Sequence, residues 1–253
     1  FLIMKIIESP KEIELFLKKL KKRSSGISPE IEKTVRNILN DLKTKGDSAV
    51  KKYTREFDKH NLPLKLTASD ISRYAKKADK KIIEALEVSA KRIWAFHERQ
   101  KEGSWSFKEG ETLLGQIIRP IERVGVYVPG GKASYPSTVL MNVIPAQVAG
   151  VKDIALCVPT PKGETNPYVM AAIKLLGIKE VYRIGGAQAI GAMAYGTESV
   201  KGVDKIVGPG NIFVAIAKKI VFGDVDIDMI AGPSEILIIA DETANPGFVA
   251  ADM

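Results

Sequence analysis

A short apolar run, a Pro-Gly-Gly break and a new helix start follow one another in the segment VGVYVPGGKASYPSTVLMNVIPAQ, residues 124–147. Backbone N–H groups in such a turn point outward and the helix dipole favours negative charge, which is typical of an anion or nucleotide pocket. Three more Gly-containing blocks follow apolar runs, at 185–188, 208–211 and 232–235. One such block is weak evidence, but four in series predict one ligand-binding edge of an α/β sheet.

Apolar runs and helical patterns alternate from Val124 onward. The apolar runs lie at 124–128, 154–158, 181–184, 205–207 and 236–240, and the helical patterns between them lie at about 136–150, 166–176, 187–196 and 211–220. This alternation is typical of right-handed βαβ crossovers and predicts a mostly parallel sheet. Ligands of such sheets lie beyond the carboxyl ends of the strands, where the four Gly-containing blocks fall.

The first part of the chain, residues 1–103, has the patterns of helices. Ser9-Pro10 and Ser28-Pro29 each place a capping residue before a proline at the first helical position. Gly46-Asp47 restarts a helix, and a longer amphipathic helix is predicted over 79–101, with its first aspartate as the N-cap. The N-terminal part is therefore expected to be helical.

The fold class predicted from these patterns is α/β. Residues 126–235 are expected to form a Rossmann-like module with a mostly parallel sheet. Residues 1–125 would be the helical N-terminal part of a second, discontinuous α/β domain, to which residues 236–253 return. Within the N-terminal part, apolar segments at 105–107 and 112–118 predict two paired strands around a Glu-Gly turn.

Composition excludes several classes of protein. The 253 residues are 45% hydrophobic and 27% charged, as in soluble globular proteins, and no apolar run reaches the length of a membrane span. A single cysteine, Cys157, fits a reducing compartment, and we expect a cytoplasmic protein. The net charge of +8 raises the question of nucleic acid, but lysines alternate with glutamates in the helical stretches, which predicts solvated helix faces and no nucleic-acid partner.

Side chains that carry chemistry are few. His60, in the polar stretch DKHNLP, is interpreted as a solvated loop residue, and His97 as a surface or structural histidine, because neither has a second His or Cys at metal spacing. Cys157 lies in the middle of a predicted strand and is expected to be a buried, inert thiol. Aspartates alternate over 224–228, so they would either bind a cation or, in the simpler interpretation, mark a strand end that enters a loop.

Two interpretations stay open for Gly185-Gly186. It is either a strand-to-helix turn that needs positive φ, or a dinucleotide site to which Gln188 contributes an amide donor or acceptor. The block GPGN would similarly place Asn211 at a helix start. Neither block matches G-x-G-x-x-G, and no acidic residue is suitably placed for a ribose, so the standard Rossmann fingerprint is absent.

Taken together, these blocks resemble the histidinol dehydrogenase family. The segments that carry the resemblance run in order along nearly the whole chain: GDSAVKKYTREFDK (46–59), RVGVYVPGGKASYPSTVLMNVIPAQVAGV (123–151), YRIGGAQAIGAMAYGT (182–197), DKIVGPGN (204–211) and DIDMIAGPSEILIIAD (226–241).

The resemblance implies an NAD-dependent oxidation of L-histidinol, through an aldehyde-level intermediate, to L-histidine, with two NAD reduced in succession. It implies that Tyr127, Gln188 and Asn211 contact NAD and that Ser234 contacts the substrate. The residue types suit these roles, because a phenol can stack and donate, amides can bind ribose or phosphate oxygens, and a hydroxyl can reach a small polar ligand.

The resemblance also implies a homodimer and one zinc ion per active site. The zinc ligands, a Gln-x-x-His pair with a later Asp and His, and a Glu-His pair for acid–base catalysis would all lie downstream of Met253. No catalytic and no metal-binding residue is therefore expected in this chain, which should be inactive alone. A helix that starts at Asn245-Pro246 would have only about two turns before Met253, and we expect the natural chain to continue.

Two other classes of function stay open. One is a different NAD(P)-linked enzyme that acts on an aldehyde, which would need a reactive cysteine, and Cys157 is badly placed for that. The other is a non-catalytic, truncated paralogue that binds a nucleotide.

Overall fold

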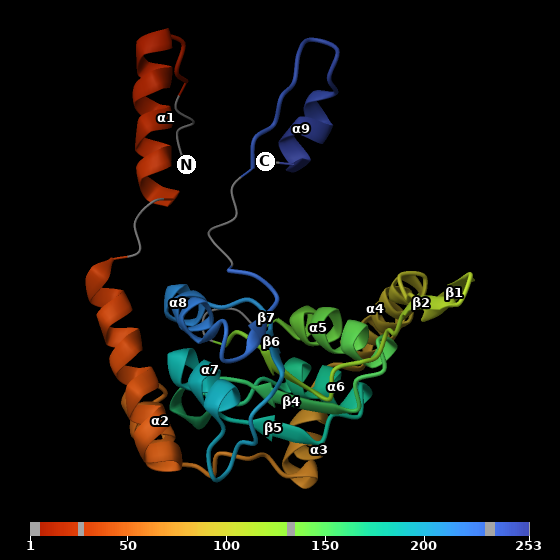
Figure 1. Ribbon diagram of the computed structural model, residues 1–253. Coiled ribbons are helices and arrows are strands. Elements are labelled where there is room, and N and C mark those ends of the chain that lie inside the picture. The colour runs from red at the N-terminus through yellow and green to blue at the C-terminus, as the bar shows by residue number, and fades with distance from the viewer. Residues whose placement is uncertain (1–5, 25–27, 131–134, 231–235, 253) are drawn as a thin grey trace.

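A parallel sheet forms the centre of the computed structural model, which describes residues 6–24, 28–130, 135–230 and 236–252 (Figure 1). Among these residues the sheet has five strands in the order β5-β4-β3-β6-β7. The strands are β3 (Arg123–Tyr127), β4 (Asp153–Cys157), β5 (Glu180–Tyr182), β6 (Lys205–Val207) and β7 (Asp226–Ile227). The first four confirm the predicted runs. The strand order reverses beside β3, so β3 and β6 flank a topological switch point, where α/β sheets bind ligands.

Helices cover both faces of this sheet, as Figure 1 shows. The crossover helices are α5 (Pro136–Val148), α6 (Pro167–Leu175), α7 (Gly186–Tyr195) and α8 (Ile212–Val221), with a short 3₁₀ turn η1 (Pro161–Gly163) after β4. Alternate strand residues enter two separate cores: Tyr127 and Cys157 lie in one, and Val126 and Leu156 lie in the other. The α/β class predicted from the sequence is confirmed.

The N-terminal helices pack on the crossover helices. They are α1 (Pro10–Ser24), α2 (Pro29–Phe57), α3 (Ala68–Ala75) and α4 (Lys80–Glu98). Helix α2 lies against α7 and α8, α3 against α6, and α4 against α5 and α6. The predicted restart inside α2 is confirmed, because Gly46 interrupts its helical geometry with a φ of +48°. This packing brings the C-terminal end of α2 to the sheet.

Three elements project from the body of the sheet in Figure 1: α1, the hairpin of β1 (Trp105–Glu109) and β2 (Thr112–Gln116), and α9 (Pro246–Asp252). The hairpin is antiparallel around the Glu-Gly turn, as predicted. In the part of the chain that the structure describes, no helix is both long and apolar enough to cross a membrane. The division of the chain at 125/126 and 235/236 stays a prediction.

The strand expected at 236–240 is not observed. Ile236, Leu237 and Ile239 are 70%, 84% and 89% exposed and lie in no strand. The fifth strand is instead β7, where the Asp226 N–H donates to the Asp204 carbonyl and the Asp228 N–H to the Ile206 carbonyl. An apolar run indicates only that a segment tends to be buried, whereas a strand forms where a neighbouring strand has unpaired backbone N–H and C=O groups. The free edge of β6 provides these groups to residues 226–228.

Candidate functional site

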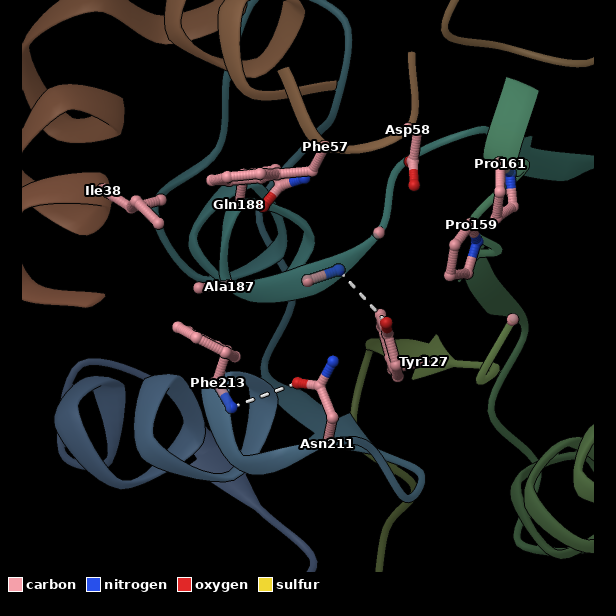
Figure 2. Close-up of a pocket in the computed structure, with 13 residues that line it drawn as sticks. Ile38, Phe57, Asp58, Tyr127, Pro159, Pro161, Ala187, Gln188, Asn211 and Phe213 are labelled. Atoms are coloured by element: carbon pink, nitrogen blue, oxygen red, sulfur yellow. Dashed lines mark hydrogen bonds between the residues drawn. The ribbon is translucent and has the colours of Figure 1, made fainter. Parts of the chain in front are cut away.

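A cavity of about 270 Å³ lies at the carboxyl edge of the sheet, beside the switch point (Figure 2). Its wall includes Tyr127, Gln188 and Asn211, the three side chains that the family resemblance implies as NAD contacts. They come from the end of β3, the first turn of α7 and the start of α8. The volume lies near the lower end of the range for small-molecule sites, about 300 Å³. The structure therefore brings three separately predicted residues together.

Tyr127 fixes the turn before α7. Its side chain is 3% exposed, and its hydroxyl accepts a hydrogen bond of 3.1 Å from the Gly186 N–H (Figure 2). Burial, with a smaller contribution from the charge of Asp58, raises the pKa of Tyr127 far above the physiological range. The phenol therefore stays neutral and keeps its own proton to donate to a ligand.

Gln188 lies almost entirely inside the protein, at 1% exposure, and its Oε1 has no hydrogen-bond partner among the described residues. Gly186, in the preceding turn, has a φ of +60°, which agrees with the interpretation of Gly185-Gly186 as a strand-to-helix turn that needs positive φ. Gln188 also lines the cavity, as the interpretation of this block as a dinucleotide site requires. A buried acceptor without a partner is expected to find one in a ligand or in water.

Asn211 is the N-cap of α8. Its Oδ1 accepts hydrogen bonds from the N–H groups of Phe213 and Val214 at 3.1 and 3.2 Å. This bonding leaves the amide nitrogen directed toward the cavity in Figure 2. Capping and ligand contact are thus compatible, because they use opposite ends of one amide.

A buried lysine clamps the loop between β6 and α8. The ammonium of Lys218, which is 2% exposed, donates to the Gly208 carbonyl at 3.0 Å and pairs with the carboxylate of Asp228. Asp228 in turn accepts the Gly208 N–H at 2.8 Å. Sequence reasoning missed this clamp. The alternating aspartates were its only signal, and each pairs with a lysine: Asp224 with Lys43, Asp226 with Lys205, Asp228 with Lys218.

The structure also places an acidic residue in the cavity wall that the sequence did not predict. Asp58, at the end of α2, is 8% exposed, and its Oδ2 has no hydrogen-bond partner among the described residues. Burial raises its pKa to about 6. An acidic ribose ligand is expected within the strand-turn-helix units of the sheet, whereas Asp58 precedes the sheet in the chain. Its one signal was its place inside the segment GDSAVKKYTREFDK.

The remaining candidates lie elsewhere. His60 is not simply solvated as predicted: its Nε2 lies 3.0 Å from Thr160 Oγ1, and burial with the charge of Arg183 lowers its pKa. His97 lies near the surface, with Nδ1 2.6 Å from Gln100 Oε1. Ser234 lies outside the described residues. Within those residues, no group of three or more His, Cys, Asp or Glu side chains is arranged to hold a metal ion.

Comparison with known proteins gives a consistent result. The family model for histidinol dehydrogenase matches residues 21–253. The chain is 54% identical over 227 residues to the histidinol dehydrogenase of Syntrophotalea carbinolica, covering 88% of this chain and 53% of that protein. It is 52% identical over 240 residues to that of Aquifex aeolicus, covering 94% of this chain and 55% of that protein.

A solved structure agrees with the sequence relatives. The crystal structure of histidinol dehydrogenase from Elizabethkingia anophelis matches with a TM-score of 0.84 and 43% identity, covering 90% of this chain and 53% of that one. The chain thus spans about half the length of the relatives that it matches. The family model covers well over half of the chain, and the relatives exceed half identity across it, so the chain belongs to the histidinol dehydrogenase family.

Proposed function

We propose that the complete protein is an NAD-dependent histidinol dehydrogenase, which oxidises L-histidinol to L-histidine. One observation carries the proposal beyond family membership: Tyr127, Gln188 and Asn211 line one cavity at the switch point of the sheet. Bound NAD would supply the hydride acceptor. The role of the three side chains is to bind and orient it.

The polar groups of the cavity fit such a cofactor. Gln188 Oε1 is a buried acceptor without a partner among the described residues, the Asn211 amide nitrogen is a donor, and the Tyr127 hydroxyl can donate. The described wall contains no lysine or arginine. Backbone N–H groups at the start of α7, supported by the helix dipole, would therefore receive the phosphates.

Zinc is different, because the described residues offer no set of ligands that fits it. We place the zinc ligands and the acid–base residues in the part of the relatives that this chain does not span. Within this chain, we propose Ser234 as a substrate contact. On this proposal the 253-residue chain alone holds a nucleotide site and catalyses no oxidation. The complete protein is a cytoplasmic homodimer that takes a small-molecule substrate.

One alternative enzyme class loses support. An aldehyde dehydrogenase with a cysteine nucleophile needs an accessible thiolate, but Cys157 is fully buried and its burial raises the pKa of the thiol well above the physiological range. The non-catalytic nucleotide-binding paralogue is an outcome of the following experiment.

The test uses the complete protein with L-histidinol, NAD and zinc. Gln188→Ala and Asn211→Ala are each expected to raise the dissociation constant for NAD about tenfold, since each removes a hydrogen-bonding group from the cavity wall. Asn40→Ala, at an exposed position of α2, is the matched control and should leave it unchanged. Calorimetry measures the affinity, and absorbance of reduced NAD measures turnover.

Wild-type affinity in both cavity variants would remove these residues from the site. A folded, zinc-loaded protein that binds NAD but never reduces it would favour the non-catalytic paralogue.

A further inference from the structure

We propose that Asp58 binds the hydroxyls of the adenosine ribose and makes the site select NAD over NADP. The inference rests on the proposed function, because it assumes that the cavity is the dinucleotide site. NAD and NADP differ only at the 2′ position of that ribose. A carboxylate accepts hydrogen bonds from a ribose diol and repels a 2′-phosphate, whereas sites for NADP supply a cation.

The geometry of Asp58 is that of a prepared acceptor. Its backbone is held on both sides, since its N–H donates to the Thr54 carbonyl at 2.8 Å and its carbonyl accepts from the Lys162 N–H at 2.6 Å. The side chain is more than nine-tenths buried and its Oδ2 has no partner among the described residues. A structural aspartate in a folded protein would normally have its oxygens satisfied.

The turn before α7 leaves room for this carboxylate. A side chain at Gly185 would place its Cβ 3.3 Å from Asp58 Oδ2 and 2.8 Å from the ring of Pro159. Figure 2 shows the carboxyl end of Asp58 directed toward that turn, whose next residue, Gly186, is bonded to Tyr127. The acceptor thus lies beside the backbone N–H groups that would meet the phosphates, as a ribose next to a pyrophosphate requires.

The opposite end of the cavity fits a purine. Figure 2 shows the rings of Phe57 and Phe213 on different sides of the space, with the ring of Phe57 directed away from Asp58 and toward Ile38. Phe57 is 49% and Phe213 37% exposed, so both rings still have surface to cover. Stacking of a base on such rings is favourable, which places adenine at this end and its ribose at the polar end.

No described cation compensates for the carboxylate inside the cavity. Tyr127 is neutral, and His60, whose pKa is lowered by burial and by the charge of Arg183, does not line the cavity. Arg183 lies outside the cavity wall too, and it donates to the Pro63 carbonyl at 3.0 Å. A 2′-phosphate would therefore be repelled by the carboxylate of Asp58 and would find no cation in the described cavity wall to pair with.

The experiment measures binding of NAD, NADP and 2′-deoxy-NAD to the complete protein by calorimetry, in the wild type, Asp58→Asn and Glu56→Gln. Glu56 is exposed on the same turn of α2 and controls for the loss of one charge. We expect Asp58→Asn to weaken NAD binding about tenfold and to lower the ratio of the NADP to the NAD dissociation constant at least tenfold. The Glu56→Gln variant should match the wild type.

The analogue 2′-deoxy-NAD lacks the 2′-hydroxyl of the adenosine ribose. Its binding to the wild type tests the inference even if the Asp58→Asn variant does not fold. Wild-type protein should bind 2′-deoxy-NAD about tenfold more weakly than NAD, and Asp58→Asn should bind the two nearly equally, as a double cycle requires. Equal affinity of the wild type for NAD and 2′-deoxy-NAD overturns the inference and leaves the proposed function standing. Failure of the wild type to bind NAD at all overturns both.

Discussion

Asp58 illustrates a conflict between stability and function within one side chain. Burying a carboxylate without a partner disfavours the charged form, so the pKa of Asp58 lies near 6 in the folded protein, above its ordinary value of 3.8. Below about pH 3 the group is largely protonated in both the folded and the unfolded states. As the pH rises from about 4 to 6 only the unfolded chain loses its proton, so this residue destabilises the fold, fully so above pH 6.

Asp58→Asn should therefore stabilise the protein at neutral pH although it weakens the site. We expect the free energy of unfolding to rise by about 1–2 kcal/mol near pH 7.5, less than the full pKa difference implies because the buried asparagine amide would also lack hydrogen-bond partners, and to change little near pH 4. Urea denaturation of the wild type, Asp58→Asn and Glu56→Gln at the two pH values measures this. A loss of stability at pH 7.5 would show that the carboxylate holds the fold together.

At the scale of elements, the loop after β6 is held between the end of β3, the residue after β7 and helix α8. Gly208 has a φ of +110°, and a side chain there would occupy the space of the Tyr127 carbonyl. Its backbone N–H and carbonyl are held by Asp228 and Lys218. The loop therefore packs against the end of β3, and it delivers Asn211 to the start of α8.

Gly208→Ala is expected to lower the free energy of unfolding by about 2–4 kcal/mol, because it combines a strained φ with a clash against backbone. Gly223→Ala is the matched control: Gly223 has a φ of +107° but open space around its missing side chain. That variant should lose only about 1 kcal/mol. Chemical denaturation compares the two, and equal losses would mean that φ alone decides the effect.

Local sequence patterns predicted most helices and strands, but not the tertiary contacts between them. The strands β3 to β6, their crossover helices and the break at Gly46 follow from apolar runs, caps and glycines, which act over a few residues. The strand expected at 236–240 was wrong because strand pairing depends on a distant neighbour, whereas the alternating aspartates at 224–228 did indicate a strand end, where β7 lies. Asp58 was missed for the same reason, since it reaches the cavity only through the packing of α2. The roles of Tyr127, Gln188 and Asn211 toward NAD stay predictions.

Across the whole molecule, apolar side chains remain exposed on the projecting elements. On the hairpin, Trp105 and Phe107 stack with ring centroids 6.1 Å apart, and Leu114 pairs opposite Phe107 on the same face. All three are at least 45% exposed. Apolar clusters of this kind mark surfaces that another protein segment covers.

We expect this hairpin face to be covered in the homodimer proposed for the complete protein. Phe107→Lys should weaken dimerisation about a hundredfold, because it places a charge at the centre of an apolar contact. Lys108→Glu, on the opposite face of the same strand, is the control and should leave the dimer intact. Light scattering after size-exclusion chromatography measures the mass, and an unchanged dimer in Phe107→Lys would exclude this face from the interface.

The distance along the chain between Asp58 and Phe213 has a consequence for synthesis. The cavity is walled by residues more than 150 positions apart, so it cannot close on the ribosome until α8 has emerged. At usual translation speeds, roughly 10–30 s pass between the emergence of the end of α2 and the emergence of α8. During that interval Phe57 and the edge of β3 that will pair with β6 are exposed to other chains, which makes this stretch of the nascent protein prone to aggregation.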